Sequence, residues 1–355
     1  MIPTTKSHHI GLFFGGLALL LALSTFLSCL MGPIEVRAWT VFEIILKKPL
    51  GLVSSSDTIT AIVWDIRFSR VLLAAMVGAA LAVSGAAFQG VLINPLADPF
   101  TIGVASGAAF GATLAIFLGG IMPLPLPDWL QGLGVIPLFS FLGAMGALFF
   151  VIAFSRMAGG MRRETMILSG IVVATFLSAL ISLLKALDEE SVQAIVFWIM
   201  GSLQGRSWAH AGFMLPYFIA GSMLLLFLAS ELDIMTLGDE QARQLGVNVE
   251  RVRHLVLIGA SLLTAACVSV SGVIGFVGLV TPHMVRLCLG GRHRIMFAGT
   301  ALLGAVIMVW SDALSRTILP GGEEVPVGVV TALLGGPFFF FILLRNRRKG
   351  LHSAH

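Results

Sequence analysis

The sequence predicts an all-α membrane protein with about ten transmembrane helices, and three observations support this prediction. Hydrophobic residues make up 57% of the 355 residues and charged residues only 11%, against roughly 25% charged residues in soluble domains. The mean hydropathy is +0.98. Apolar runs of about 20 residues, the length that crosses a bilayer as a helix, recur along the chain. We therefore expect residues 1–355 to form a single transmembrane domain.

The apolar runs can be taken in order. The first follows Lys6, His8 and His9 and resembles a secretory signal, but it is longer than a usual signal core and residues 26–28 are a poor cleavage site. We expect it to be retained as the first helix. Residues 192–203 are apolar but short, which predicts a partial or interfacial helix. The ten predicted spans lie at about 10–31, 71–92, 101–121, 135–154, 165–187, 209–230, 254–271, 272–289, 296–314 and 326–344.

Ten spans place both termini on the same side of the membrane, and the distribution of basic residues predicts which side. With the N-terminus inside, 14 of the 22 Lys and Arg residues fall in inner segments and 8 in outer segments. Inner loops of membrane proteins carry the excess of basic residues. The sequence therefore predicts a multi-pass protein of the cell (inner) membrane with both termini in the cytoplasm.

Glycines recur at helical spacing in two of the spans. Gly103, Gly107 and Gly111 form a double G-x-x-x-G pattern, and Gly11 and Gly15 form a single one. Such faces let two helix backbones approach closely. Packing within one chain and a seam between two chains both remain open interpretations.

The three cysteines, Cys29, Cys267 and Cys288, lie in or beside apolar runs and show no disulfide or metal-binding spacing. We expect them to be small buried side chains. His293 lies in a basic loop, and we expect a surface role for it rather than metal binding.

The longest polar segment, residues 231–253, separates two apolar runs. Its charges cannot lie in lipid, so it must face water or another protein. Its centre predicts a short helix with acidic residues in the first turn, an apolar stripe and a glycine at each end. A helix of two turns is unstable alone in water, so we expect a partner to dock on it, although a plain solvated loop stays open. The pattern comprises Gly238, Asp239, Glu240, Ala242, Leu245, Gly246 and Val249.

The chain lacks the sequence signatures of an enzyme. A phosphate-binding loop needs a Gly-Lys pair, and none of the five lysines follows a glycine. We also find no catalytic constellation. The formal charge of +4 reflects short basic loops rather than a basic face, so nucleic acid is not an expected partner. We therefore expect no ATP site and no cofactor in this chain.

Six segments between Asp65 and the C-terminus carry a family pattern. They are RFSRVLLAAMVGAALAVSGAAFQGVLINPLADPFTIGVASGAAFGA at 67–112, WIMGSLQG at 198–205, LGDEQARQLGV at 237–247, SGVIGFVGLVTPHMVRLCLGGRHR at 271–294, SDALSR at 311–316 and EVPVGVVTALLGGPFFFFILL at 324–344. In these segments and their order, the chain from about Asp65 to the C-terminus resembles permeases of the FecCD type, the importer subunits for iron–siderophores, haem and cobalamin. Two departures occur: Ser69 stands where the family usually has Pro, which puts the local loop geometry in question, and Ile93 stands where an Arg often precedes Asn-Pro-Leu-Ala, which removes an inner charge.

This resemblance implies a type II ABC importer permease that forms homodimers. Two separate ATP-binding cassette ATPase subunits, carrying ATP and Mg, would bind the cytoplasmic face, and a soluble substrate-binding protein would deliver substrate to the outer face. The polar segment 231–253 would then be the coupling element seated in a cleft of the ATPase. The coupling residues implied are Leu237, Gly238, Asp239, Glu240, Ala242, Arg243, Leu245 and Gly246.

The resemblance also implies that Arg67, Arg70 and Arg316 dock acidic residues of the binding protein. Guanidinium groups at the outer mouth would steer and orient an acidic surface. The alternative is that they snorkel or form structural ion pairs with Asp65 or Asp312.

The translocation path is implied along the dimer-facing parts of the second, fifth and eighth spans. The candidates are Gln89, Asn94, Gly272, Gly275 and Gly278. Each of them can equally serve helix packing.

The expected function is the permease of an ABC importer for an iron chelate (siderophore), with haem or cobalamin as alternative cargo. An ion-driven secondary transporter is an alternative from another class. Such transporters often carry ionisable residues at the middle of discontinuous helices, whereas Lys185, Arg286 and Asp312 all lie near predicted span ends. A membrane enzyme is a third option, without a motif to support it.

Overall fold

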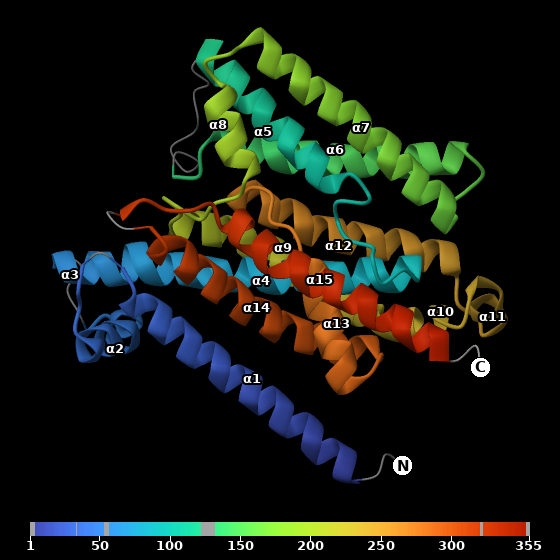
Figure 1. Ribbon diagram of the computed structural model, residues 1–355, viewed down its shortest axis with the longest axis horizontal. Coiled ribbons are helices and arrows are strands. Elements are labelled where there is room, and N and C mark those ends of the chain that lie inside the picture. Colours follow the sequence, from blue (N-terminus) through green and yellow to red (C-terminus); the bar gives the residue numbers. More distant parts are fainter. Residues whose placement is uncertain (1–3, 33, 53–56, 122–131, 320–321, 353–355) are drawn as a thin grey trace.

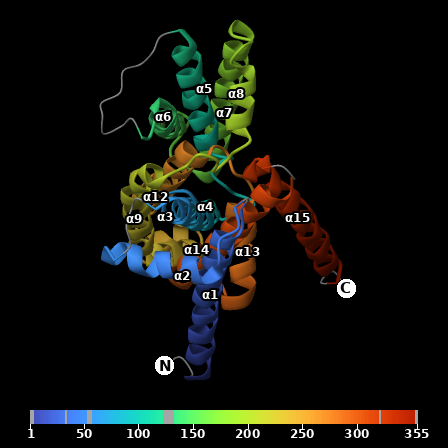
Figure 2. The same ribbon diagram turned by 90° about the vertical axis from the view of Figure 1, so that its left-hand side faces the viewer.

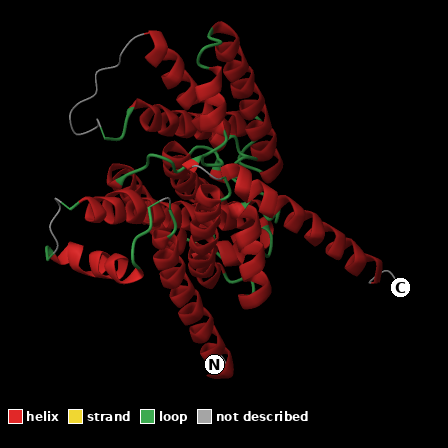
Figure 3. Cartoon of the chain, turned by 60° about the vertical axis from the view of Figure 1, so that its left-hand side comes forward, coloured by secondary structure: helices red, strands yellow, loops and turns green. Residues whose placement is uncertain are grey.

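The structure is a computed structural model that describes residues 4–32, 34–52, 57–121, 132–319 and 322–352. These residues form helices and the loops between them (Figures 1 and 3). The first half of the chain contains α1 (Thr4–Leu30), α2 (Ala38–Lys47), η1 (Lys48–Leu50), α3 (Thr58–Thr60), the π-helical η2 (Ala61–Phe68), α4 (Ser69–Leu92), α5 (Val104–Ile121), α6 (Val135–Met157) and α7 (Arg163–Leu187).

The second half continues the bundle with long helices and short connecting ones. They are α8 (Val192–Ile199), α9 (Trp208–Phe227), α10 (Ala229–Met235), α11 (Asp239–Gln244), α12 (Val249–Ser271), α13 (Val277–Leu289), α14 (His293–Thr317) and α15 (Val327–His352). Within the described ranges, seven helices are long and apolar enough to cross a membrane, and three apolar helices are shorter: Val104–Gly120, Val277–Leu289 and Val327–Phe341. These helices match the ten predicted spans in order.

Helix α4 forms the centre of the bundle. It packs against α9, α12, α13 and α14, and nearly all of its residues are buried. Helices α5 to α8 lie together on one side of α12, while α1 lies on the opposite side of the molecule (Figures 1 and 2). Helix α1 begins and α15 ends at the end of the bundle that carries α11 (Figure 1). We call this end the α11 end and the opposite one the α2 end.

Glycines let several helices meet backbone to backbone. A Cβ atom at Gly85 of α4 would overlap the carbonyl oxygen of Gly278 of α13, and one at Gly78 would overlap that of Gly304 of α14. Gly107 and Gly111 of α5 meet α6 in the same way, so this G-x-x-x-G face packs within one chain. These contacts hold α4 and α5 close to their neighbours.

Other predicted glycine contacts differ from this pattern. Gly103 meets α7 instead, where its Cβ would lie 3.2 Å from the carbonyl oxygen of Gly170. A Cβ at Gly11 or Gly15 of α1 would meet nothing within 4 Å among the described residues. Among the described residues, the single G-x-x-x-G pattern of α1 is therefore not used for helix packing.

Two predicted boundaries are wrong. The helix containing α4 begins at Thr58 rather than near residue 71, because α3 and η2 run into it without interruption. The helix of span eight begins at Val277 rather than at residue 272, because Gly272 (φ 70°) and Phe276 (φ 69°) adopt left-handed backbone conformations that a helix cannot contain. An apolar composition alone does not reveal either feature.

We predict that Gly85→Ala destabilises the protein by roughly 1–3 kcal/mol, because the added methyl group meets the backbone of α13. The thermal unfolding midpoint of the detergent-solubilised protein measures this. The control is Gly212→Ala on α9, where a Cβ meets nothing within 4 Å and alanine favours the helix by about 1 kcal/mol. Equal midpoints for the two variants would contradict the close α4–α13 contact.

Candidate functional site: an anchored surface helix and two polar clusters

The short helix predicted within residues 231–253 is present as α11. Gly238, with φ 111°, precedes it, and Gly246, with φ 85°, follows it, so both turns use conformations that glycine adopts readily. The Ala242 side chain is fully buried against the bundle. Two acidic residues, Asp239 and Glu240, occupy the first turn, where negative charge suits the helix dipole.

Asp239 ties α11 to two long helices. Its carboxylate accepts hydrogen bonds from Arg253 Nη2 of α12 at 2.8 and 2.9 Å, and from Arg163 Nη2 of α7 at 2.6 Å. Arg253 also donates to the Met161 carbonyl oxygen at 2.6 Å, which fixes the loop before α7. A six-residue helix is thereby fixed on the ends of two bundle helices, so a displacement of α11 would pull on both of them.

The two arginines also keep Asp239 charged. Burial raises the pKa of this carboxyl, but the hydrogen bonds and positive charges of Arg253 and Arg163 outweigh burial and hold its pKa below the usual range. Because the pKa in the folded state is lowered, the anchor contributes stability above the ordinary carboxyl pKa of about 4. That contribution is lost as the pH falls through the lower folded-state value.

The outer side of α11 is exposed. Leu237 and Leu245, which flank the helix, are 56% and 62% exposed, and Glu240, Gln241, Arg243 and Gln244 are exposed between them. Clefts lie on both sides of this surface. One is lined by Arg162, Arg163, Asp239 and Arg253 among others, and the second by Phe227, Ile234, Leu245 and Arg251 among others. A surface that combines exposed apolar side chains, charged side chains and clefts is suited to binding a protein partner.

A second polar cluster lies at the α2 end, around the fully buried Asp312 of α14. Arg70 of α4 donates to Asp312 Oδ1 at 2.9 and 3.0 Å and to both carboxylate oxygens of Glu324 at 2.7 and 2.8 Å. Arg316 Nε lies 3.1 Å from Asp312 Oδ2. Two guanidinium groups thus share two carboxylates, so their charges are compensated inside the chain.

The same arginine cluster fixes the end of α1. Arg316 Nη2 donates to Ser28 Oγ at 2.7 Å, and Arg67 Nη1 donates to the Cys29 carbonyl oxygen at 3.1 Å. Carbonyl groups at a helix C-terminus lack partners within the helix, and here guanidinium groups satisfy them. The structure therefore gives all three predicted docking arginines internal partners.

The structure bears on only one of the two interpretations of these arginines, the one in which they form structural ion pairs. Among the structural ion pairs, the one with Asp312 is present, whereas Asp65 has an exposed side chain. Arg67 and Arg70 are themselves buried. Docking of a binding protein by these arginines stays a prediction that no observation here tests.

The predicted path residues separate into different environments. Gln89 of α4 and Asn94 line one cleft of about 620 Å³ at the α11 end, where Arg286 of α13 donates to Gln89 Oε1 at 3.2 Å. Gly275 lines another cleft, between residues 199–200 and α15. Gly272 and Gly278 instead make close backbone contacts, with Trp198 and Leu81 among others. Their geometry fits helix packing, which was the open alternative.

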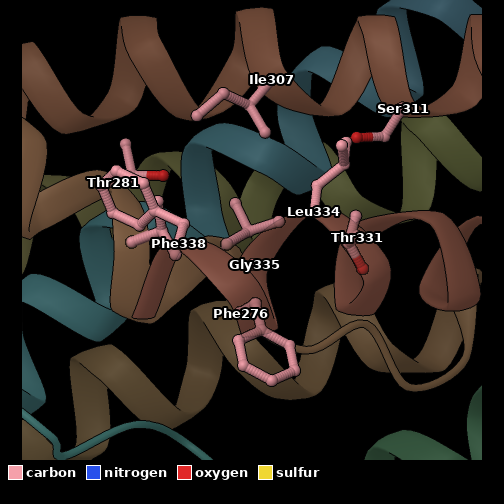
Figure 4. Close-up of a pocket in the computed structure, with 10 residues that line it drawn as sticks. Phe276, Thr281, Ile307, Ser311, Thr331, Leu334, Gly335 and Phe338 are labelled. Atoms are coloured by element: carbon pink, nitrogen blue, oxygen red, sulfur yellow. The ribbon is translucent and has the colours of Figure 1, made fainter. Parts of the chain in front are cut away.

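A further cavity of about 200 Å³ lies between α13, α14 and α15 (Figure 4). Its lining is mostly apolar, with Phe276, Leu334 and Phe338 from two sides. The hydroxyl groups of Thr281 and Ser311 are buried there and have no hydrogen-bond partner among the described residues. Helix α15 therefore packs less completely on the bundle than α14 packs on α4.

Two expectations about single residues, His293 and Cys288, were wrong. His293 is buried rather than on the surface, because its Nδ1 and backbone nitrogen contact Asp233 Oδ1 of α10 at 2.7 and 2.8 Å. Cys288 is exposed, whereas Cys29 and Cys267 are buried as expected. The partners of α11, Arg163 and Arg253, had no local signal beyond their basic character.

Ser69, which stands where the family usually has proline, does not disturb the local backbone. The Ser69 hydroxyl donates to the Asp65 carbonyl oxygen, and the helix continues from η2 into α4 without a break. Ile93 ends α4 in a left-handed conformation, with φ 46°.

The chain matches the FecCD transport family over residues 20–345. It is 43% identical to the uncharacterized ABC transporter permease YvrB of Bacillus subtilis, covering 93% of this chain and 92% of that protein. It is 41% identical to the cobalamin import permease BtuC of Halobacterium salinarum, with 87% and 80% covered. It is 36% identical to the hemin transport permease HmuU of Yersinia pestis, with 95% and 97% covered.

Among solved structures, the chain is similar to one described as an inward-facing conformation of a metal-chelate type ABC transporter. The TM-score is 0.80 and the identity 33%, covering 94% of this chain and 98% of that chain. The apolar helices, the fold and these relatives define a multi-pass membrane permease of the ABC-transporter class. The chain belongs to the FecCD transport family, whose members are permease subunits without an ATPase site of their own.

We predict that Asp312→Asn destabilises the protein by roughly 3–5 kcal/mol, because two buried guanidinium groups lose an anionic partner. The thermal midpoint of the purified protein measures this loss. The matched control is Asp65→Asn at the same end, which removes an exposed carboxylate and should change stability by less than about 0.5 kcal/mol. Unchanged stability of the Asp312 variant would show that the cluster is not structural.

Proposed function

We propose that this chain is the transmembrane permease subunit of a binding-protein-dependent ABC importer and forms the translocation path for an iron chelate. Two separate ATPase subunits, which carry ATP and Mg, drive it through α11. The observation that carries this proposal is the anchoring of an otherwise exposed short helix to α7 and α12 by Asp239. Haem and cobalamin are the alternative cargo.

The proposed coupling role follows from two properties of α11. Its outer side, from Leu237 to Leu245, carries exposed apolar and charged side chains that a partner can grip. Its inner side is fixed to two bundle helices by charge-assisted hydrogen bonds, which are the stronger kind. Closure of the ATPase pair on ATP would therefore displace α7 and α12 together with α11. This is a rigid-body switch between two states.

The relatives support a chelate as cargo. Their names give cobalamin, hemin and iron(3+)-hydroxamate as substrates of three of them, and molybdate as the substrate of a fourth. The first three are large metal complexes. An iron chelate fits this class. Among the described residues at the α2 end, Arg67 donates to carbonyl oxygens only, so its positive charge is the one that an acidic surface of a binding protein would meet.

We further propose a homodimer with the α11 end in the cytoplasm. The excess of basic residues in inner segments supports that orientation. Helix α15 contacts α13 and α14, and its C-terminal part extends away from the bundle (Figure 2). One face of α15 is therefore available to a second copy of the chain.

We predict that Leu245→Glu strongly weakens co-purification of the ATPase, because a charge replaces a 62% exposed apolar side chain at the C-terminal end of the proposed contact surface. Interface anchors of this kind typically contribute 2 kcal/mol or more, which corresponds to about a 30-fold weaker association. The control is Ile318→Glu at the α2 end, where a 53% exposed apolar side chain should tolerate the change. Wild-type association of the Leu245 variant would refute the docking surface.

We predict a different defect for Asp239→Asn, which keeps the outer side of α11 but weakens its anchor. The ATPase should still bind and hydrolyse ATP, while substrate moved per ATP in proteoliposomes falls roughly tenfold, equal to about 1.4 kcal/mol of lost coupling. The control is Glu190→Gln, which removes an exposed carboxylate beyond the C-terminal end of α7 and should transport normally. If both variants transport equally well, the anchor does not transmit the motion.

A further inference from the structure

Helix α2 lies across the bundle. In Figure 1 it is seen end-on beside the end of α1, and in Figure 2, viewed along the bundle, it extends sideways. It follows α1 after the short segment 31–37 and contacts α1 and η2. Its orientation therefore differs from that of the apolar spans, and it sits at the level where α1 ends.

The sequence of α2, AWTVFEIILK, separates polar from apolar residues around the helix. At about 100° per residue, Thr40, Glu43 and Lys47 fall within one sector about 60° wide, and the other seven residues are apolar. Glu43 and Lys47 form an ion pair on this sector. Such a narrow polar sector is typical of a helix that lies on a membrane with only one edge in water.

The described residues cover only part of the apolar surface of α2. Val41 and Ile44 are buried against the bundle. On the opposite side, Trp39 is 72% exposed, Phe42 44% and Leu46 53%. These three residues, spaced i, i+3 and i+7, form one stripe, which we call the α2 stripe. A large exposed apolar stripe marks a surface that contacts a membrane or another protein.

The α2 stripe is continuous with the apolar outer surface of α1. The rings of Phe42 and Phe26 of α1 pack edge to face with centroids 6.3 Å apart. Leu23 and Leu27 of α1 are 50% and 43% exposed. Because α1 is a membrane span, its exposed side chains face lipid. The stripe therefore extends a lipid-facing surface at the end of that span.

We propose that α2 lies in the headgroup–acyl boundary of the leaflet at the α2 end. Trp39, Phe42 and Leu46 enter the boundary, and Glu43 and Lys47 face water. Tryptophan is enriched at the membrane–water interface, because an indole ring has an apolar body and one polar N–H, and Trp39 is such a residue. The helix would fix the tilt of α1 and, through η2, the level of the arginine cluster in the membrane.

The test is spin labelling in lipid nanodiscs with the full-length protein. The exposed cysteine is removed by Cys288→Ser, and labels are attached in turn through Trp39→Cys, Phe42→Cys and Leu46→Cys. The controls are Glu43→Cys and Lys47→Cys on the polar sector of the same helix. Collisions with oxygen, which concentrates in lipid, and with a water-soluble nickel chelate are then compared by power saturation. Monodisperse elution of each variant checks its fold.

We expect the ratio of oxygen to nickel collisions to be at least about fivefold higher at the three stripe positions than at the two controls. Equal ratios at all five positions would overturn the proposal, because α2 would then stand in water. The proposal would also fail if the stripe labels were exposed to the nickel chelate until a soluble binding protein or a second permease copy was added, because a protein would then be the occupant. These outcomes do not depend on ATP coupling or on the cargo.

Discussion

The carboxylate of Asp239 makes the exposed polar segment part of the bundle. Without its bonds to Arg163 and Arg253, α11 would be a six-residue helix held mainly by one buried alanine. A helix this short has no stability of its own in water. With those bonds, its position is determined by α7 and α12. Any force on the exposed surface of α11 therefore acts on two helices at once.

The two ends of the bundle use charge differently. At the α11 end, Asp239 is partly exposed and joins a surface helix to the bundle. At the α2 end, Asp312 is fully buried and joins α4, α14 and the end of α1 through arginines. Between the ends, α4 is enclosed and makes backbone contacts through glycines. This gives a rigid centre, whereas α15 lines a cavity of about 200 Å³ and is packed less tightly.

The sequence predicted the spans because bilayer thickness sets the length of an apolar helix. It predicted α11 because glycines and acidic residues mark the ends of a helix locally. It could not predict which partners bind the charges, since Arg70 and Asp312 are 242 positions apart and nothing local links them. The start of α13 was missed because Phe276 adopts a left-handed conformation, which is rare for a residue with a Cβ atom and has no sign in its residue type. His293 was placed on the surface because its partner, Asp233, lies on another helix.

The central claim is that a separate ATPase drives this permease through α11, and transport in proteoliposomes tests it most directly. The permease is reconstituted with its ATPase, with a hydrolysis-deficient ATPase, or alone, and uptake of an iron chelate delivered by the binding protein is measured in the presence and absence of an ion gradient. The account predicts uptake only with the active ATPase and ATP, whatever the gradient. Equal uptake by the permease alone, abolished by collapsing the gradient, would contradict it.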